Sequence, residues 1–236
     1  MTPRKLLSAA TRQLQDCSCA TPRLDAELLL CHSLHCSRSW LIAHADDQLD
    51  DAICKAFERL LKRRKQRQPV AYITGEKEFW SRVFAVNSDV LIPRPETEHL
   101  IDAMLQEFPD RNAAYRFCDI GTGSGCIAVT LACEFPQARI TASDISPQAL
   151  VVAQKNAAKH NVAKRIEWRE GDMLAALATT DGPFDAMISN PPYVGYAEME
   201  TLEPELAFEP RHALTDEADG LRYLVCLLEH TAEWLK

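Results

Sequence analysis

Residues 115–125 read YRFCDIGTGSG, an apolar run that includes Asp119 and passes directly into a loop with three glycines. The stretch Ile127–Cys133 follows with mostly apolar residues and is expected to be helical. Together they predict a strand, a glycine loop and a helix. In a parallel sheet, such a loop lies at the carboxyl ends of the strands, where ligands bind.

The alternation of strand and helix continues toward the C-terminus. Arg139–Ser143 predicts a strand that leads to Asp144, and a helix is expected from Pro147 to about Lys159. Further strands are predicted at Arg165–Arg169 and Phe184–Ser189. Strands that alternate with helices imply a parallel sheet wound in a Rossmann-like way, so the fold class is α/β.

Residues 1–75 predict a small all-helical domain that precedes this sheet. The N-terminus of a second helix is expected at Thr21, with Pro22 as the first helical residue. The basic run 62–65 suits a helix C-terminus exposed to solvent, and docking of an acidic partner is the alternative. A short third segment contains Trp40, Leu41 and Ile42. The apolar positions of the other helices are Leu6, Leu7, Ala10, Leu14, Leu24, Leu28, Cys31, Ile53, Phe57, Leu60 and Leu61.

Residues 76–92 are predicted to form a β-hairpin that links the two domains. Phe84 and Val86 alternate with small or polar neighbours, and the turn is expected at Asn87-Ser88-Asp89. The larger domain then begins at residue 93 and continues to residue 236.

Charge is distributed unevenly along the chain, whose net charge is −8. Residues 1–75 contain 12 Lys and Arg against 8 Asp and Glu, so the rest of the chain carries a net charge of −12. An acidic catalytic part disfavours a nucleic-acid substrate, because gripping a phosphate backbone requires clustered positive charge.

Membrane and metal-binding classes receive little support from the composition. No apolar run approaches the roughly 20 residues that cross a bilayer, so a soluble, cytoplasmic protein is expected. The nine cysteines are odd in number and scattered, which favours reduced thiols. Cys17 and Cys19 have no suitably spaced partners for zinc, and no metal is predicted.

Three strand ends predict a nucleoside site. In the loop formed by Gly121, Thr122, Gly123, Ser124 and Gly125, the backbone can approach a ligand closely, and Cys126 stands where the dinucleotide fingerprint requires a third glycine, which disfavours NAD. A carboxylate at the next strand end can accept both ribose hydroxyls, or it can be a solvated strand end. That carboxylate is Asp144. The third strand end offers the Asp172 carboxylate to the adenine amine and the Met173 thioether to the adenine ring.

The tetrad Asn190-Pro191-Pro192-Tyr193 follows the fourth predicted strand. It could be only a rigid turn, because proline restricts its neighbours. Beside the other loops, however, it suits methylation of an amide nitrogen, whose lone pair is delocalised into the carbonyl. The Asn190 oxygen and the Pro191 carbonyl can each accept one N–H and stabilise the developing positive charge. Tyr193 can stack on the flat group, and the prolines keep the loop rigid.

This tetrad, together with the glycine loop, resembles the amino-methyltransferases that modify adenine, guanine or glutamine nitrogens. Further motifs resemble the release factor glutamine methyltransferases, the HemK/PrmC family, over nearly the whole chain. These motifs are PVAYITG at 69–75, EFW at 78–80, LIPRPETE at 91–98 and FEP at 208–210.

The resemblance implies an activity and a set of site residues. It implies S-adenosylmethionine as cofactor and N5-methylglutamine in the Gly-Gly-Gln tripeptide of class I release factors as product. The helical domain would help to hold that partner. Gly121–Gly125, Asp144, Met173 and Asn190 would contact the cofactor, and Asn190–Tyr193 would present the glutamine.

The family resemblance implies a seven-stranded sheet, with further strands after the helix that is expected here at Tyr223–Leu235. The chain ends at that helix, so we expect a C-terminally incomplete methyltransferase domain with an open edge at Phe184–Ser189. Two alternatives remain. One is a DNA adenine or ribosomal RNA guanine methyltransferase, and the other is a truncated cofactor-binding module without turnover.

Overall fold

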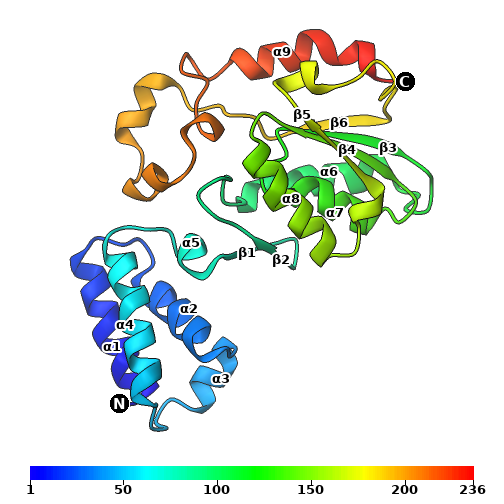
Figure 1. Ribbon diagram of the computed structural model, residues 1–236. Helices are drawn as coiled ribbons and strands as arrows, with labels where there is room; N and C mark the ends of the chain where they lie inside the picture. The colour runs from blue at the N-terminus through cyan, green and yellow to red at the C-terminus, as the bar shows by residue number, and fades with distance from the viewer. The chain divides into compact units, whose positions relative to one another are not determined.

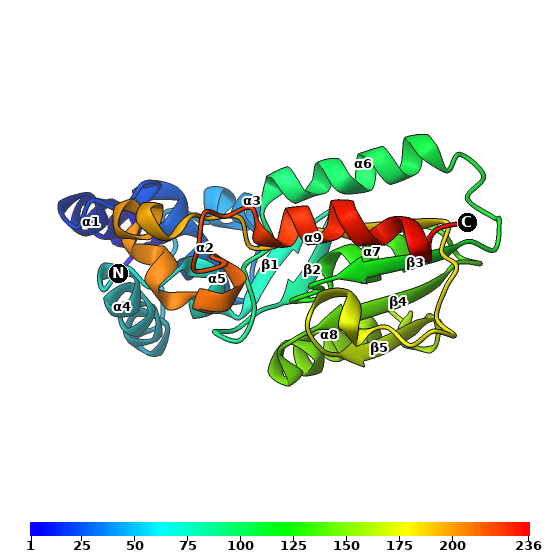
Figure 2. The same ribbon diagram turned by 90° about the horizontal axis from the view of Figure 1, so that it is seen from above.

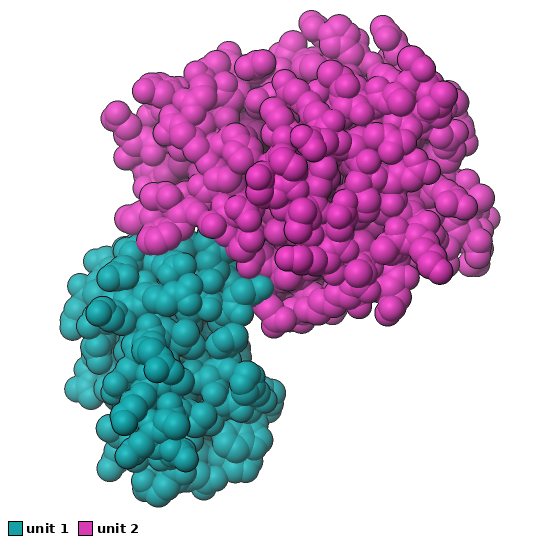
Figure 3. All heavy atoms as spheres, in the orientation of Figure 1, with its two compact units in different colours: residues 1–75 teal, residues 76–236 magenta.

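The computed structural model describes residues 1–236, and the chain divides into two compact units, Met1–Gly75 and Glu76–Lys236 (Figure 3). Each unit has its own hydrophobic core. No helix in the structure is both long enough and apolar enough to span a membrane.

The first unit consists of helices only (Figure 1). They are α1 (Pro3–Asp16), α2 (Pro22–Leu34), α3 (Arg38–Ala43), α4 (Asp51–Lys65) and α5 (Val70–Thr74). Side chains cap three of these helices: Thr2, Ser37 and Asp50 each accept a backbone N–H of the first turn. The buried core includes Leu6, Leu7, Ala10, Leu14, Ala26, Leu29, Leu30, Leu41, Phe57, Leu61 and Ile73.

The buried face of α2 differs from the sequence-based expectation. Leu24 and Leu28 are 38% and 37% exposed, whereas Leu29 and Leu30 are fully buried. Four consecutive apolar residues at 28–31 do not define a face by periodicity, so the packing against α1 and α4 decides it. In α3, Leu41 is buried and Ile42 is 79% exposed.

A buried ion pair joins α2 to α4. The Arg64 Nε atom donates to Asp25 Oδ2 at 2.7 Å, and both side chains are almost fully buried. Thr21, the N-cap residue, donates its hydroxyl to Asp25 Oδ1 rather than accepting a helix N–H. The expectation that the basic run is solvated is therefore wrong for Arg64, because the buried carboxylate of a neighbouring helix holds it inside.

Removing the carboxylate of this pair breaks a contact between two charged groups that are buried inside the first unit. We expect Asp25→Ala to destabilise the first unit by about 3–5 kcal/mol, the range for breaking a buried pair. Hydrogen–deuterium exchange of α2 and α4 should accelerate accordingly. Asp16→Ala, a change at an exposed acidic residue of α1, is the control. Equal protection of the Asp25→Ala variant and the parent would show that the pair does not stabilise the helices.

The second unit begins with an antiparallel hairpin, β1 (Glu76–Phe79) and β2 (Arg82–Ala85). Its turn is Trp80-Ser81, where both residues have positive φ, as a two-residue hairpin turn requires. The expected turn at Asn87–Asp89 is wrong as the hairpin turn. Asn87 does accept the Asp89 N–H, but this local turn lies in the non-strand segment after β2.

A four-stranded parallel sheet forms the centre of the second unit (Figures 1 and 2). Its strands are β3 (Arg116–Ile120), β4 (Arg139–Asp144), β5 (Ile166–Glu170) and β6 (Ala186–Ser189), in the order β5-β4-β3-β6. The helices are α6 (Glu98–Glu107), α7 (Cys126–Glu134), α8 (Pro147–Lys159) and α9 (Arg222–His230). Short 3-10 turns are η1 (Pro95–Thr97), η2 (Ala163–Arg165), η3 (Met173–Ala176), η4 (Tyr196–Thr201), η5 (Pro204–Phe208), η6 (Arg211–Ala213) and η7 (Thr231–Trp234).

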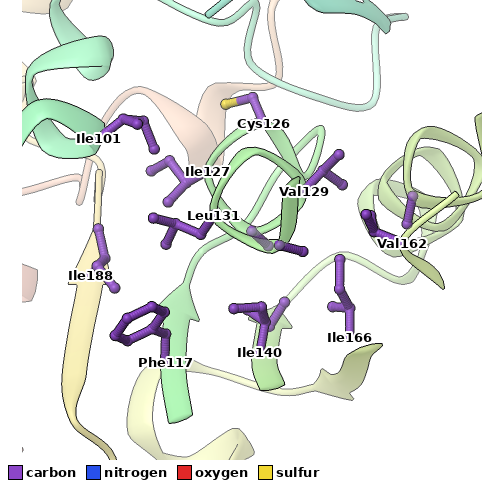
Figure 4. Close-up of a cluster of buried hydrophobic side chains, with 14 of the residues drawn as sticks. Ile101, Phe117, Cys126, Ile127, Val129, Leu131, Ile140, Val162, Ile166 and Ile188 are labelled. Atoms are coloured by element: carbon purple, nitrogen blue, oxygen red, sulfur yellow. The ribbon is translucent and has the colours of Figure 1, made fainter. Parts of the chain in front are cut away.

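Successive residues of β3 supply cores on opposite faces of this sheet. Phe117 packs with Ile127 and Leu131 of α7 in the larger core (Figure 4). Cys118 and Ile120 contribute to a smaller core on the face covered by α9. Helices therefore cover both faces, as the Rossmann-like pattern predicts.

The C-terminal part of the sheet differs in detail from the expectation. The helix expected at 223–235 ends at His230, and η7 follows. β6 pairs only with β3 in the sheet, but Phe184, just before β6, forms a parallel bridge with Leu235. The Phe184 N–H donates to the Trp234 carbonyl at 2.7 Å. The fourth strand itself begins at Ala186, two residues later than predicted.

Candidate active site

The carboxyl ends of the four parallel strands open on one pocket within the second unit. Its empty space is about 880 Å³, counting the part open to solvent. The expected site residues that line it are Gly121, Thr122, Gly123, Ser124, Asp144, Asp172, Met173, Asn190 and Pro192. Gly125, Pro191 and Tyr193 are not part of the lining.

The three glycines of the loop after β3 differ in what they do. All have positive φ, between 54° and 79°, which favours glycine over residues with a Cβ. A Cβ on Gly121 or Gly123 would meet no atom within 4 Å, so at these two positions only the backbone conformation requires glycine. A Cβ on Gly125 would lie 3.0 Å from the Ala153 Cβ. Gly125 thus allows α7 to pack closely on α8 and does not face the pocket.

Asp119 fixes this loop to the start of α7, a role that the sequence reasoning missed. Its Oδ2 accepts the Thr122 hydroxyl at 2.7 Å and the Ala128 N–H at 3.1 Å. The side chain is fully buried, and its Oδ1 has no hydrogen-bond partner. Burial raises the pKa of Asp119 to about 7. The available signal was an acidic residue inside an otherwise apolar strand.

This raised pKa predicts a pH dependence of stability. Asp119 has its ordinary pKa of 3.8 in the unfolded chain and a pKa of about 7 in the folded chain, so burial of the carboxylate costs stability as the pH rises between these values. Asp119→Asn removes the titration. Its melting temperature relative to the parent should therefore rise by several degrees from pH 5 to pH 8.

The control is Asp102→Asn, a change at an exposed residue of α6. Its melting temperature should keep a constant offset from that of the parent. A constant offset for Asp119→Asn as well would contradict the assignment of a raised pKa.

Asp144 at the end of β4 faces the pocket but is already hydrogen-bonded. Its Oδ2 accepts the Gly123 N–H at 2.8 Å, and its Oδ1 accepts the Ser146 N–H at 2.9 Å. Burial raises the pKa of this carboxyl group. Each carboxylate oxygen retains a further lone pair. Asp144 can therefore accept ligand hydroxyls while it ties the glycine loop to β4.

The tetrad after β6 is divided between the pocket and the surface. Asn190 lines the pocket, and its Nδ2 donates to the Thr97 hydroxyl at 3.2 Å. Pro191 is buried, and Tyr193 is 60% exposed. A Cβ on Gly220 would clash with the Tyr193 carbonyl oxygen, so only glycine allows the backbone to pack against the tetrad there.

Four residues of segment 91–98 also line the pocket, and side-chain acceptors hold this segment in place. Glu209 accepts the Ile92 N–H at 3.0 Å and the Arg94 guanidinium at 2.7 Å. Glu98 accepts the Trp80 N–H at 2.7 Å. These bonds join three segments that the sequence singled out separately, 78–80, 91–98 and 208–210.

Asn156 in α8 was missed by the sequence reasoning as well. It is fully buried, and its Nδ2 donates to the carbonyl oxygens of Ala85 and Ser124 at 3.0 and 2.8 Å. Its Oδ1 accepts the Ala85 N–H at 2.7 Å. Asn156 therefore fastens both the hairpin and the glycine loop to α8. A polar residue on the apolar face of a helix was its only signal.

Two family models match the chain. The PrmC N-terminal domain matches residues 5–75, and the methyltransferase small domain matches residues 97–219. A release factor glutamine methyltransferase of Koribacter versatilis is 41% identical over 237 residues, which cover 100% of this chain and 83% of the relative. The chain belongs to the release factor glutamine methyltransferase family. Another member, from Nitratidesulfovibrio vulgaris, is 42% identical over 236 residues, covering 100% of this chain and 79% of that protein.

A solved structure supports the family fold. The human METTL16 catalytic domain, in complex with MAT2A 3′UTR hairpin 6, matches with a TM-score of 0.52 and 15% identity. The match covers 80% of this chain and 75% of that domain. At this identity the likeness concerns the methyltransferase fold alone. Within residues 1–236, no cluster of three or more His, Cys, Asp or Glu side chains could hold a metal ion.

Proposed function

We propose that the chain transfers a methyl group from S-adenosylmethionine to the side-chain amide nitrogen of a glutamine in a class I release factor, within its Gly-Gly-Gln motif. The observation that carries this proposal is the placement of Asn190 in the pocket. Its Nδ2 is engaged by Thr97, and its Oδ1 accepts no hydrogen bond from the protein. Membership in the release factor glutamine methyltransferase family supports the choice of substrate.

The pocket residues fit this cofactor. The open space beside the Gly121 and Gly123 backbone leaves room for a ligand against the loop. Asp144 has unused acceptor capacity for the ribose hydroxyls, and Met173 and Asp172 line the pocket near the end of β5, where adenine would lie. S-adenosylmethionine supplies a methyl group on a positively charged sulfur.

The residues of the tetrad act on the substrate amide as acceptors. Asn190 Oδ1 and the Pro191 carbonyl each take one N–H of the glutamine amide, which aims the nitrogen lone pair at the methyl group. Both oxygens also stabilise the positive charge that develops on the nitrogen. No strong base is required for this step: the methyl group leaves the sulfur as S-adenosylhomocysteine forms, and the cationic methylated nitrogen then releases one proton to water. The buried Pro191 keeps the loop rigid, so the catalytic effect comes mainly from orientation.

The surface around the tetrad fits a protein substrate. Tyr193 is exposed beside the pocket and can stack on the flat amide. The second unit is acidic, with a net charge of −12, which disfavours contact with a phosphate backbone. The helical first unit, residues 1–75, would contribute contacts to a partner as large as a release factor.

The activity test compares two kinds of substrate. The protein is incubated with S-adenosylmethionine and either a class I release factor or duplex DNA, and mass spectrometry locates any added methyl group. We expect the methyl group on the glutamine of the release factor. Methylation of adenine in DNA, or of neither substrate, would overturn the proposal.

Two variants separate chemistry from cofactor binding. Asn190→Ala should lose at least about 100-fold in kcat, because one transition-state acceptor is worth that much, and should retain cofactor affinity within several-fold. Asp144→Ala should weaken cofactor binding by roughly 1.5–3 kcal/mol, the range for hydrogen bonds to a charged group. Calorimetry measures the affinities, and the exposed Asn112→Ala change is the control. Unchanged turnover of Asn190→Ala would refute the mechanism.

A further inference from the structure

Asn190 can perform its proposed role in only one of two side-chain orientations. A side-chain amide has nearly the same shape after a 180° rotation, which exchanges its oxygen and nitrogen. With the oxygen toward the substrate, Asn190 accepts a glutamine N–H. With the nitrogen there, two donors face each other and no bond forms. Catalysis therefore requires the orientation in which the nitrogen has a partner in the protein and the oxygen is available to the substrate.

Thr97 contacts the nitrogen end of this amide. Asn190 Nδ2 donates to Thr97 Oγ1 at 3.2 Å, and both residues line the pocket. The oxygen end has no partner within the protein. Thr97 is buried and follows Arg94 in the tight turn η1, where its own N–H donates to the Arg94 carbonyl at 3.1 Å.

The position of the Thr97 hydroxyl is fixed from both sides of the turn. Before it, Glu209 holds the Ile92 N–H and the Arg94 guanidinium. After it, Glu98 accepts the Trp80 N–H. The hydroxyl is thus presented to Asn190 by a segment that is attached to two distant parts of the chain.

We propose that Thr97 is a positioning residue, whose hydroxyl accepts from Asn190 Nδ2 and so holds the amide in place while its oxygen meets the substrate nitrogen. After a 180° rotation of the amide, the same hydroxyl can donate to the Asn190 oxygen. Only the first arrangement leaves an acceptor for the substrate N–H. This role rests on the proposed function, since it matters only for a substrate that offers N–H groups. Thr97 itself exchanges no proton with the substrate. It acts by supplying a partner for the amide nitrogen in the orientation that methylation uses.

Thr97→Val tests this role, because valine keeps the shape of threonine but accepts no hydrogen bond. We expect kcat for release factor methylation to fall roughly 3- to 10-fold, as for the loss of one neutral hydrogen bond, with the cofactor Kd unchanged. Thr97→Ser keeps a hydroxyl and should restore kcat to within about twofold. Thr130→Val is the matched control, since the Thr130 hydroxyl is buried in α7 without a partner, and it should leave kcat unchanged.

A double-mutant comparison distinguishes positioning from a structural role. In the Asn190→Ala background, Thr97→Val should cause no further loss of kcat, because no amide remains to be oriented. An equal loss in both backgrounds would overturn the proposal. So would an unchanged kcat in Thr97→Val, or a loss that Thr97→Ser does not restore.

A measurement on the free protein separates this proposal from the proposed function. The side-chain ¹⁵N–¹H signals of Asn190, assigned by their absence in Asn190→Ala, report on the amide directly. Exchange of these hydrogens with water should be several-fold faster in Thr97→Val than in the parent. If the parent fails to methylate a release factor, the proposed function falls, and the exchange rates still decide whether Thr97 holds the amide. Equal rates in the two proteins would overturn the positioning role.

Discussion

One buried carboxylate oxygen, Asp119 Oδ2, determines where the chain turns from β3 into α7. It accepts both the Thr122 hydroxyl and the Ala128 N–H, so the loop and the first turn of the helix are held together. A buried carboxylate is costly, as its raised pKa indicates. The unfavourable burial of Asp119 therefore occurs where the loop must be fixed for a ligand to approach its backbone.

The rest of the pocket is assembled from segments far apart in sequence, and buried polar side chains join them. Glu209 holds residues 92–94, Asn156 holds both Ala85 and Ser124, and Thr97 meets Asn190. Such bonds are specific in direction, so each fixes the position of one wall relative to another. Residues of segment 91–98 thus line the same pocket, although this segment precedes the parallel sheet in the chain.

Much of the fold was predictable because its signals are local. The strand–loop–helix pattern around 119–125 and the alternation that follows it indicate the parallel sheet, and each predicted strand of that sheet begins and ends within two residues of its expected bounds. The α/β fold and the membership in the glutamine methyltransferase family are confirmed. Most of the expected site residues line one pocket, while their roles in binding and catalysis remain predictions.

The errors have physical causes. The hairpin turn was misplaced because Trp80 and Ser81 are unusual residues for positive φ. The buried face of α2 was misassigned because a continuous apolar run has no periodicity. Asp119 bonds within nine residues, and its only local signal was its place in an apolar strand. Asn156 and Glu209 bond to segments 71 and 117 residues away, and local sequence does not show which segments they hold. Thr97 belongs to the same class, since its partner lies 93 residues away.

The central claim is that Asn190 Oδ1 accepts a hydrogen bond from the amide nitrogen to be methylated. A crystal structure of the protein with S-adenosylhomocysteine and a class I release factor would test it most directly. The account predicts the glutamine side-chain nitrogen within about 2.7–3.2 Å of Asn190 Oδ1, with Asn190 Nδ2 still bonded to Thr97. A glutamine nitrogen held by other groups, or an Asn190 amide turned with its nitrogen toward the substrate, would contradict it.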